Sequence, residues 1–357
     1  MQNNENTEDL LAVVSQSGPH VTFFSVGSYR ELGTVEVPAE PHELCFDPRR
    51  RLLYCSITYR SGYYHANTGR AHEIAVIDPD ARRVVDVIDL APDHGPHGLV
   101  LDPVRDLLYV SVEATDSAQG ALLAVDPGSR KVVRRISVAA PGPHWFTVTP
   151  DGRHAYTSNK EAPYVSVVDL ETGRLLDRIP VGGGEGIDIS PDGRYVFVAT
   201  PKGDFAPPAA DAGNAADVGV AVIDTATGRV VRTLPADGIT FPVHTTSQGL
   251  VLSGELRMAA RPDGGPGALG TQTNGVLNVH GAGLEPLGRV EVGRFPLTVT
   301  SSPDGSLAYV ANVLSSTVTV VHLPSLRTVT TLPVRRGGEA GAHGLAYVPA
   351  ATGGEPR

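Results

Sequence analysis

The chain repeats one pattern of hydrophobic and polar positions seven times. A run of β-branched residues leads into a polar turn with Gly, Asp or Pro, and a second β-branched run follows, all within 17 residues. Two such runs around a polar turn predict a β-hairpin. The copies are 21–37, 74–90, 122–138, 165–181, 220–236, 276–292 and 318–334.

A second module, built as strand, tight turn and strand, lies between the hairpins. An aromatic residue stands six positions after its turn proline. Two strands and a hairpin give four strands per unit and a period of about 41 to 58 residues, which is typical of a β-propeller blade. The module covers 44–56, 99–111, 146–158, 187–199 and 299–311, with aromatics Tyr54, Tyr109, Tyr156, Phe197 and Tyr309.

The two ends of the chain complete one blade together. Residues 341–349 supply an innermost strand, and residues 10–37 supply three outer strands that lack an inner one. Joining them closes the ring and removes its free edges. The sequence therefore predicts an all-β, seven-bladed β-propeller of four-stranded blades over residues 10–349, with disordered tails at 1–9 and 350–357.

The repeat resembles a known family. The turn at Pro303, followed by AYVAN (308–312) and STVTVVHL (316–323), is similar to the YVTN-repeat seven-bladed β-propellers. The Pro-His pairs before the inner strands also resemble the lactonase-type propellers, which include sugar lactonases and a muconate-cyclising enzyme. The likeness covers nearly the whole chain and implies the fold. It gives little guidance on function, because this superfamily mixes enzymes, metal proteins and scaffolds.

Charge and composition limit the classes of partner that the chain is expected to bind. Lys and Arg number 29 against 39 Asp and Glu, for a net charge of −10, and no basic run appears. This argues against nucleic-acid and anionic-membrane partners, and a small-molecule substrate is expected instead. Cys45 and Cys55 lie in apolar runs as reduced core thiols. We expect a soluble cytoplasmic protein, since no apolar stretch has transmembrane length and the N-terminus lacks a signal pattern. The oligomeric state stays open.

Long connections all leave the same face of the predicted disc. The turns between strands one and two, and between strands three and four, are short in every repeat, whereas those between strands two and three vary. The longest are 58–72, 200–218 and 255–274. Insertions confined to one face indicate a functional side with lid-like loops.

Four of the twelve histidines occupy one position in the repeat. Counting back six residues from the turn proline reaches the mouth of the innermost strand, where the fourth blade has Glu185 and the sixth has Leu297. The fifth blade lost its proline, and aligning FPV-His244 with FPL-Thr298 puts His244 one residue past this position. The four are His42, His97, His144 and His343.

Equivalent inner-strand positions meet around the central channel, so these imidazoles are expected to converge. Histidines with a carboxylate form the usual ligand set for zinc, iron, manganese or copper. The sequence thus predicts a divalent metal ion, bound by the four histidines with His244 as a fifth candidate. Three carboxylates are candidate catalytic residues, as further ligand or general base: Glu113, Glu185 and Glu255.

Several functions remain compatible with this pattern. A Lewis-acidic ion favours lyase, isomerase, cyclase or lactone-hydrolase chemistry. An all-imidazole set also suits a copper oxidoreductase. A non-catalytic interaction scaffold is the third reading, in which each imidazole only bonds to the backbone of a neighbouring blade.

Overall fold

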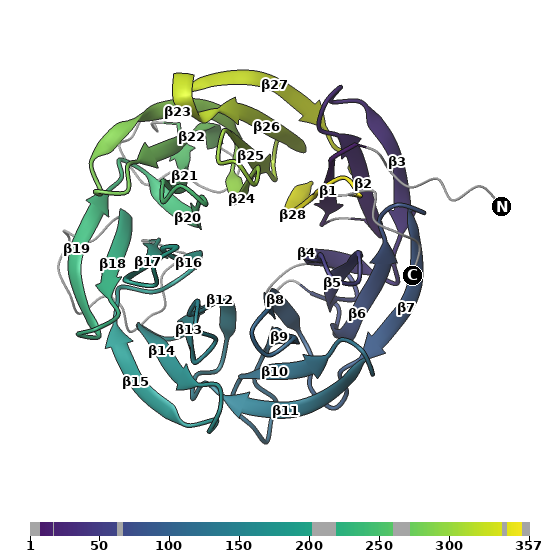
Figure 1. Cartoon of the computed structure of the whole chain (residues 1–357), viewed down its shortest axis with the longest axis vertical. Coiled ribbons are helices and arrows are strands. Elements are labelled where there is room, and N and C mark those ends of the chain that lie inside the picture. The colour runs from purple at the N-terminus through teal and green to yellow at the C-terminus, as the bar shows by residue number, and fades with distance from the viewer. Residues whose placement is uncertain are drawn as a thin grey trace.

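Seven four-stranded antiparallel sheets surround a central axis in the computed structural model of the chain (Figure 1). The structure describes residues 8–16, 18–62, 67–201, 219–259, 272–337 and 341–351. Apart from one 3₁₀ turn at Leu323–Ser325, the elements named in these residues are all strands. The predicted all-β propeller is confirmed.

Six blades are continuous in sequence, and each runs from its innermost to its outermost strand. They comprise β4 (Glu40–Asp47), β5 (Leu52–Tyr59), β6 (Arg70–Asp78) and β7 (Arg83–Asp89); β8 (Pro96–Asp102), β9 (Leu107–Val112), β10 (Ala121–Asp126) and β11 (Lys131–Ser137); β12 (Pro143–Val148), β13 (His154–Asn159), β14 (Tyr164–Asp169) and β15 (Leu175–Pro180); β16 (Ile187–Ile189), β17 (Tyr195–Thr200), β18 (Gly219–Asp224) and β19 (Arg229–Pro235); β20 (Ile239–Thr245), β21 (Val251–Met258), β22 (Gln272–His280) and β23 (Pro286–Arg294); and β24 (Pro296–Ser301), β25 (Leu307–Asn312), β26 (Thr317–His322) and β27 (Arg327–Pro333).

The seventh blade joins the two ends of the chain. Its strands are β28 (Ala342–Val348), β1 (Leu10–Ser15), β2 (His20–Ser25) and β3 (Glu31–Glu36), in that order. The pairing of Leu10 with Val348 closes the ring as the repeat pattern predicts. The joined termini complete a four-stranded blade, so the sheet edges that remain are single strands facing the channel or the rim, as in other propellers.

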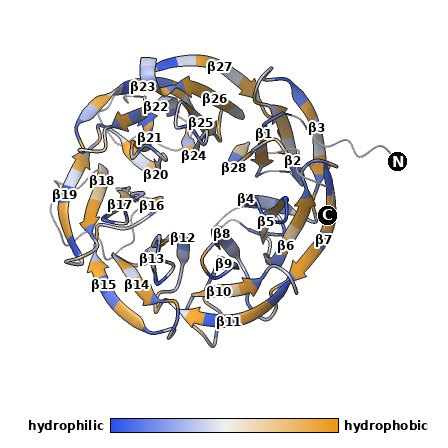
Figure 2. Ribbon diagram, in the orientation of Figure 1, coloured by the Kyte–Doolittle hydropathy of each residue, from blue (hydrophilic) through white to orange (hydrophobic). Residues whose placement is uncertain are grey.

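The hydrophobic core lies between successive blades. The strand-two rings Tyr54 and Tyr109 are almost fully buried, and each packs against aliphatic side chains of the following blade. The middle strands are mostly apolar. The outer strands contain both apolar and polar residues, and most of their side chains face water (Figure 2). Burying one such large side chain stabilises the fold by about 1.5–3 kcal/mol.

The long connections differ in how much of them the structure describes. Strands β21 and β22 extend into the 255–274 loop, and β5 and β6 flank the 58–72 loop. Residues 63–66, 202–218 and 260–271, the core of the predicted lid, lie outside the described residues, as do most of the two terminal tails. No helix in the described ranges is long and apolar enough to span a bilayer.

Candidate metal centre at the channel mouth

Serine hydroxyls of strand two fix the position of the inner-strand histidines. Ser56 accepts a hydrogen bond from the backbone N–H of Glu43 at 3.0 Å and donates one to the carbonyl oxygen of His97 at 2.8 Å. Ser111 forms the equivalent bridge, since it accepts a hydrogen bond from the backbone N–H of Gly98 and donates one to the carbonyl oxygen of His144. Each serine thus ties its own inner strand to the next blade, so the histidine backbones cannot shift independently.

Close approach of neighbouring inner strands requires glycine after the histidine in two blades. A Cβ on Gly344 would lie 2.4 Å from the carbonyl oxygen of His42, and one on Gly98 would lie 3.0 Å from that of His144. A Cβ at Gly344 would clash with backbone, and one at Gly98 would fit only if the neighbouring strand moved by a few tenths of an ångström. The glycines therefore bring the histidine-bearing strands close enough for their rings to meet.

The four predicted imidazoles converge as the sequence pattern indicated. His42 is the centre of the group, with ring centroids 4.2 Å from His343, 4.8 Å from His97 and 5.8 Å from His144. The rings of His97 and His144 are 4.7 Å apart. All four residues are at most 3% exposed.

Carboxylates accompany every one of these imidazoles. Glu43 Oε1 lies 3.1 Å from His343 Nδ1 and 3.5 Å from His42 Nδ1. Glu113 Oε1 lies 3.0 Å from His97 Nε2, and Glu185 Oε2 lies 3.3 Å from His144 Nδ1. Of these contacts, the one between Glu113 and His97 Nε2 is a hydrogen bond, and such a partner on one ring nitrogen fixes the tautomer and orients the other nitrogen, as is usual for metal-bound histidine.

Two groups of ligand atoms are close enough to hold a cation. One nitrogen each from His42, His97 and His144 lie within 4.8 Å of one another, and so do ligand atoms of His42, Glu43 and His343. A tetrahedral zinc site with Zn–N bonds of about 2.0–2.1 Å needs nitrogens about 3.4 Å apart.

Burial keeps the central imidazoles uncharged. Desolvation holds the pKa of His42 well below its usual value, and the neighbouring His343 and His97 lower it further. Desolvation and the same kind of imidazole neighbours hold the pKa of His144 well below normal too. Nδ1 of His42 and of His97 has no hydrogen-bond partner among the described residues. Neutral imidazole is the form that binds metals.

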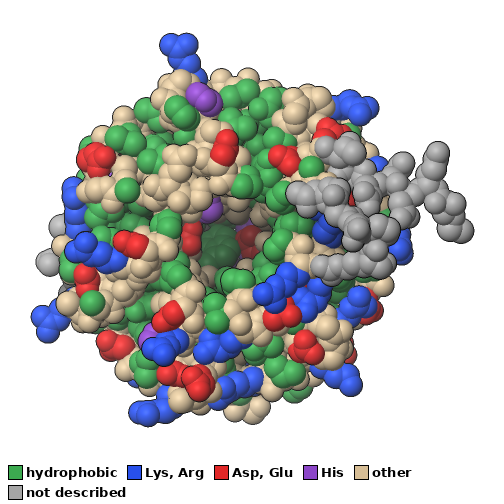
Figure 3. Space-filling model, viewed as in Figure 1, with side chains coloured by type: hydrophobic (Ala, Val, Ile, Leu, Met, Phe, Trp, Pro, Cys, Tyr) green, Lys and Arg blue, Asp and Glu red, His purple; other side chains and the backbone are tan. Residues whose placement is uncertain are grey.

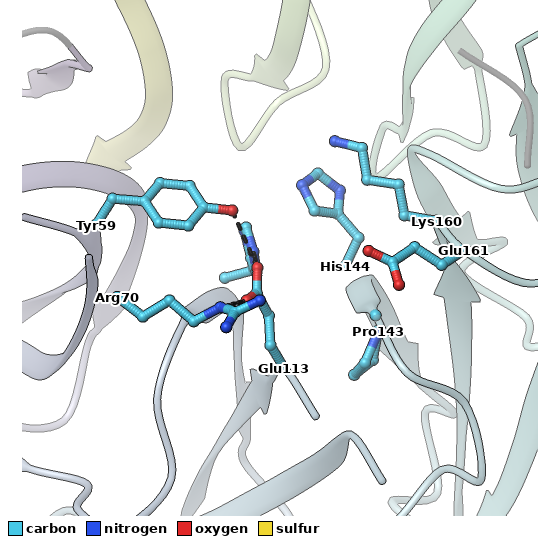
Figure 4. A pocket seen from close by; sticks show the side chains of 9 residues that line it. Tyr59, Arg70, Glu113, Pro143, His144, Lys160 and Glu161 are labelled. Carbon is cyan, nitrogen blue, oxygen red and sulfur yellow. Dashed lines mark hydrogen bonds and ion pairs between the residues drawn. The ribbon is translucent and has the colours of Figure 1, made fainter. Parts of the chain in front are cut away.

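A pocket of about 40 Å³ opens beside His97 and His144, on the face that carries the long loops. Lys160 and Glu161 form one wall, and Arg70 and Tyr59 form the other (Figure 4). The remaining lining residues are Glu113, Gly142 and Pro143.

Opposite charges offset each other across this pocket. Burial opposes ionisation of Glu113, but hydrogen bonds from His97 and Tyr59 and the charge of Arg70 bring its pKa to about 2. Lys160 Nζ lies 3.3 Å from Glu185 Oε1. Desolvation lowers the pKa of Lys160 to about 8 although Glu185 acts in the opposite direction, and desolvation raises that of Glu185.

Two predicted site residues lie elsewhere. Strand pairing of Thr240 with Glu255, and of Pro296 with Asn312, puts Phe241 at the histidine position of the fifth blade and His244 three residues beyond it. His244 belongs to neither metal-capable group of the described residues.

Glu255 occupies a structural position in strand two. It is fully buried and accepts hydrogen bonds from Arg257 Nε at 2.9 Å and from Asn278 Nδ2 at 3.2 Å. These contacts hold the β21–β22 connection together, and none of them involves the imidazole cluster.

Sequence reasoning missed Glu43, Lys160 and Trp145. The signal for Glu43 is its place directly after His42 in the motif Pro-His-Glu. The Trp145 ring stacks 6.2 Å from His343 at an interplanar angle of 26°, across the channel from its own blade. Its approach depends on the ring closing, which no local pattern reveals.

Fold and site together define a seven-bladed β-propeller with an imidazole–carboxylate cluster at the mouth of its channel. No protein-family model matches this chain. Among curated proteins it is 27% identical to the hydrazine synthase subunit beta of Kuenenia stuttgartiensis over 227 residues (57% of this chain and 59% of that one). It is 25% identical to the uncharacterized protein YncE of Salmonella typhimurium over 209 residues, which are 57% of this chain and 50% of that one. The matches thus span about half to three fifths of these relatives.

Solved structures show the same fold at low sequence identity. The Kuenenia stuttgartiensis hydrazine synthase has a TM-score of 0.65 at 20% identity, with coverage of 90% of this chain and 96% of that one. The dihydro-heme d1 dehydrogenase NirN in complex with DHE has a TM-score of 0.59 at 18% identity, with coverage of 98% and 76%. A functionally unknown protein from Desulfotomaculum acetoxidans reaches 0.69 at 13% identity, with coverage of 95% and 99%.

Proposed function

We propose that this propeller is a metal-dependent enzyme that acts on a small organic molecule at the channel mouth. The observation that carries the proposal is the trio His42, His97 and His144. Three buried imidazoles from consecutive blades each offer a nitrogen within 4.8 Å of the others. Rigid inner strands hold them, which favours a preorganised site.

Two carboxylates of this site position imidazoles rather than carry protons. Glu113 has a pKa of about 2 and already receives hydrogen bonds from His97, Tyr59 and Arg70. A carboxylate this acidic is a poor proton carrier near neutral pH. It therefore orients His97, as outer-shell partners of metal ligands do. Glu185 performs the same task for His144.

The pocket offers polar and paired charged groups to a small substrate. Lys160 and Arg70 bring positive charge from opposite walls, and Tyr59 adds a hydroxyl (Figure 4). A bound ion would act as a Lewis acid on a carbonyl or carboxylate group. The reaction class we propose is accordingly a lyase, isomerase or cyclase reaction, or lactone hydrolysis. Cytoplasmic location is part of the same proposal.

We also infer that the blades are YVTN-type repeats. The asparagine that ends strand two has the same role in two blades: Asn159 Nδ2 donates to the carbonyl oxygen of Tyr164 at 2.9 Å, and Asn312 Nδ2 donates to that of Thr317 at 3.3 Å. This bond closes the turn into strand three, which gives a physical reason for the residue at this point of the motif.

A copper oxidoreductase is the second candidate. The group formed by His42, His97 and His144 contains only imidazole donors, which suits copper. One structure with the same fold is described as a dehydrogenase. This candidate predicts the same ligands but a different metal.

Elemental analysis of protein purified without an affinity tag tests these proposals. Wild type is expected to retain about one transition-metal ion per chain, and the triple variant His42→Ala/His97→Ala/His144→Ala is expected to retain none. His154→Ala/His322→Ala is the matched control, because both histidines lie away from the channel mouth. Copper would favour the second candidate. Equal metal contents in wild type and triple variant would overturn both, and absence of metal from both would leave the interaction scaffold.

A further inference from the structure

A second polar cluster lies further along the channel, near the opposite ends of the inner strands. His244 Nδ1 is 3.3 Å from Asp188 Oδ2, and His244 Nε2 is 2.9 Å from Ser301 Oγ. The three residues come from β16, β20 and β24, the inner strands of three consecutive blades (Figure 1). A carboxylate on Nδ1 and a hydroxyl on Nε2 are the contacts by which a histidine activates a serine.

Blade symmetry shows that Asp188 and His244 are exceptional. Their position, three residues past the ring of histidines, faces the next blade and pairs with the strand-two aromatic in most blades. The other five blades have small or uncharged side chains there, so packing alone does not require charge. These residues are Cys45, Val100, Thr147, Thr300 and Ala346.

Backbone N–H groups hold Asp188 in its orientation. Thr245 N donates to Asp188 Oδ2 at 2.7 Å, and Ile189 N donates to Oδ1 at 2.8 Å. Both carboxylate oxygens are thus held by backbone groups, and Oδ2 lies 3.3 Å from His244 Nδ1, where it can accept the Nδ1–H proton. This arrangement leaves Nε2 to accept the hydroxyl proton of Ser301.

The cluster can be reached from solvent. The side chains of His244 and Asp188 are 23% and 26% exposed, and Ser301 is half-buried. In the space-filling view, the ring has a central hollow whose wall carries a histidine and acidic side chains (Figure 3). A small electrophile entering the channel can therefore approach Ser301.

We propose that Ser301 is a nucleophile for small acyl esters, with His244 as its general base and Asp188 as a positioning residue. Ser301 Oγ bonds to the acyl carbon while His244 Nε2 takes its proton. The ester C–O bond then breaks, and the alcohol leaves with that proton. Water repeats the sequence on the acyl-serine, which releases the carboxylic acid and restores Ser301.

Covalent labelling with a fluorophosphonate probe tests this directly. We expect one adduct on the folded wild-type chain, located at Ser301 by peptide mass mapping, with loss of fluoride. Removing a general base costs a factor of about 10²–10⁴, so His244→Ala should slow labelling by at least about 100-fold. Asp188→Asn should slow it as well, and Asp188→Glu, which keeps a carboxylate, should retain more of the rate.

Control variants distinguish a loss of serine reactivity from a loss of folding. Ser247→Ala, at an exposed serine near the same end of β20, should be labelled like wild type, and the thermal midpoint of each variant reports its stability. Locating the adduct on wild type does not depend on whether any variant folds. No adduct on folded wild type, an adduct at another serine, or an unchanged rate in His244→Ala would overturn the proposal. The metal content of His244→Ala should equal that of wild type, which keeps this test independent of the proposed metal centre.

Discussion

The Ser56 hydroxyl donates a hydrogen bond to the carbonyl oxygen of His97, 2.8 Å away in the next blade. The same hydroxyl accepts the backbone N–H of Glu43. One buried side chain therefore satisfies two backbone groups from two blades and fixes the spacing between them. Ser111 and Ser158 make the corresponding bonds to His144 and Glu185. The metal-capable cluster depends on this series of bridges.

Removing the bridge should cost stability. Ser56→Ala leaves the Glu43 N–H and the His97 carbonyl oxygen buried without their partner, at a cost of about 1–3 kcal/mol in folding free energy. We expect the free energy of unfolding, measured in urea, to fall by that amount, while Ser117→Ala, at an exposed loop serine, changes it little. A loss below about 0.5 kcal/mol would contradict the bridging role.

Adding a methyl group between inner strands should also destabilise the ring. Gly344→Ala places a Cβ 2.4 Å from the carbonyl oxygen of His42, so backbone must move. Overpacking of this kind costs about 1–3 kcal/mol. Gly182→Ala is the matched control, because nothing lies within 4 Å of its Cβ. Thermal denaturation of both variants should show a clear loss only for Gly344→Ala.

Neutralising Glu113 should weaken metal binding without removing a ligand. Outer-shell partners of metal-bound histidine typically contribute 10–100-fold in affinity. Glu113→Gln is therefore expected to raise the Kd for Zn²⁺ by about 10–100-fold in a competition titration with a chelating dye. Glu171→Gln, on an exposed turn, should bind as wild type does, and an unchanged Kd in Glu113→Gln would argue against a metal at His97.

Metal-free protein should lose stability as the pH falls below about 6.5. The pKa values of His42 and His144 lie well below normal when folded, first because of burial and then because of neighbouring imidazoles. The unfolded chain therefore binds more protons below its histidine pKa of about 6.5. Stability is fully present above that pH and falls by up to about 1.4 kcal/mol per pH unit for each histidine. Glu113, with a folded pKa of about 2, adds a loss in the same direction between about pH 4.3 and 2.

Urea unfolding in the presence of a chelator at pH 7, 6 and 5 measures this loss. His42→Gln/His144→Gln should flatten the dependence, because the groups that remain neutral when buried are gone. His154→Gln should keep the wild-type slope. If the double variant has the slope of wild type, other groups control the acid response.

Much of the fold could be predicted because the residues of each repeat encode its own strands and turns. The 17-residue hairpins, the turn prolines and the aromatics six positions later all lie where the strands require them. The convergence of His42, His97, His144 and His343 also followed, since symmetry-related positions must meet at the axis. Whether these rings bind metal, and which reaction they would serve, stays a prediction.

The fifth blade shows where this reasoning failed. Without its turn proline, the alignment of His244 with Thr298 was two residues out, and Phe241 holds the ring position instead. A shift of two residues keeps a side chain on the same face of the strand but moves it about 6–7 Å along the strand, which takes His244 out of the imidazole cluster.

The sequence by itself determined the seven blades, the closure by both termini and the ring of four imidazoles, because these follow from repetition and period-two alternation. Only the tertiary structure decided which carboxylate meets which imidazole, that Glu255 serves a turn, and that Asp188, His244 and Ser301 form one chain of contacts. Those contacts join side chains from different blades. Their distances depend on how blades pack and twist against each other, which no single repeat encodes.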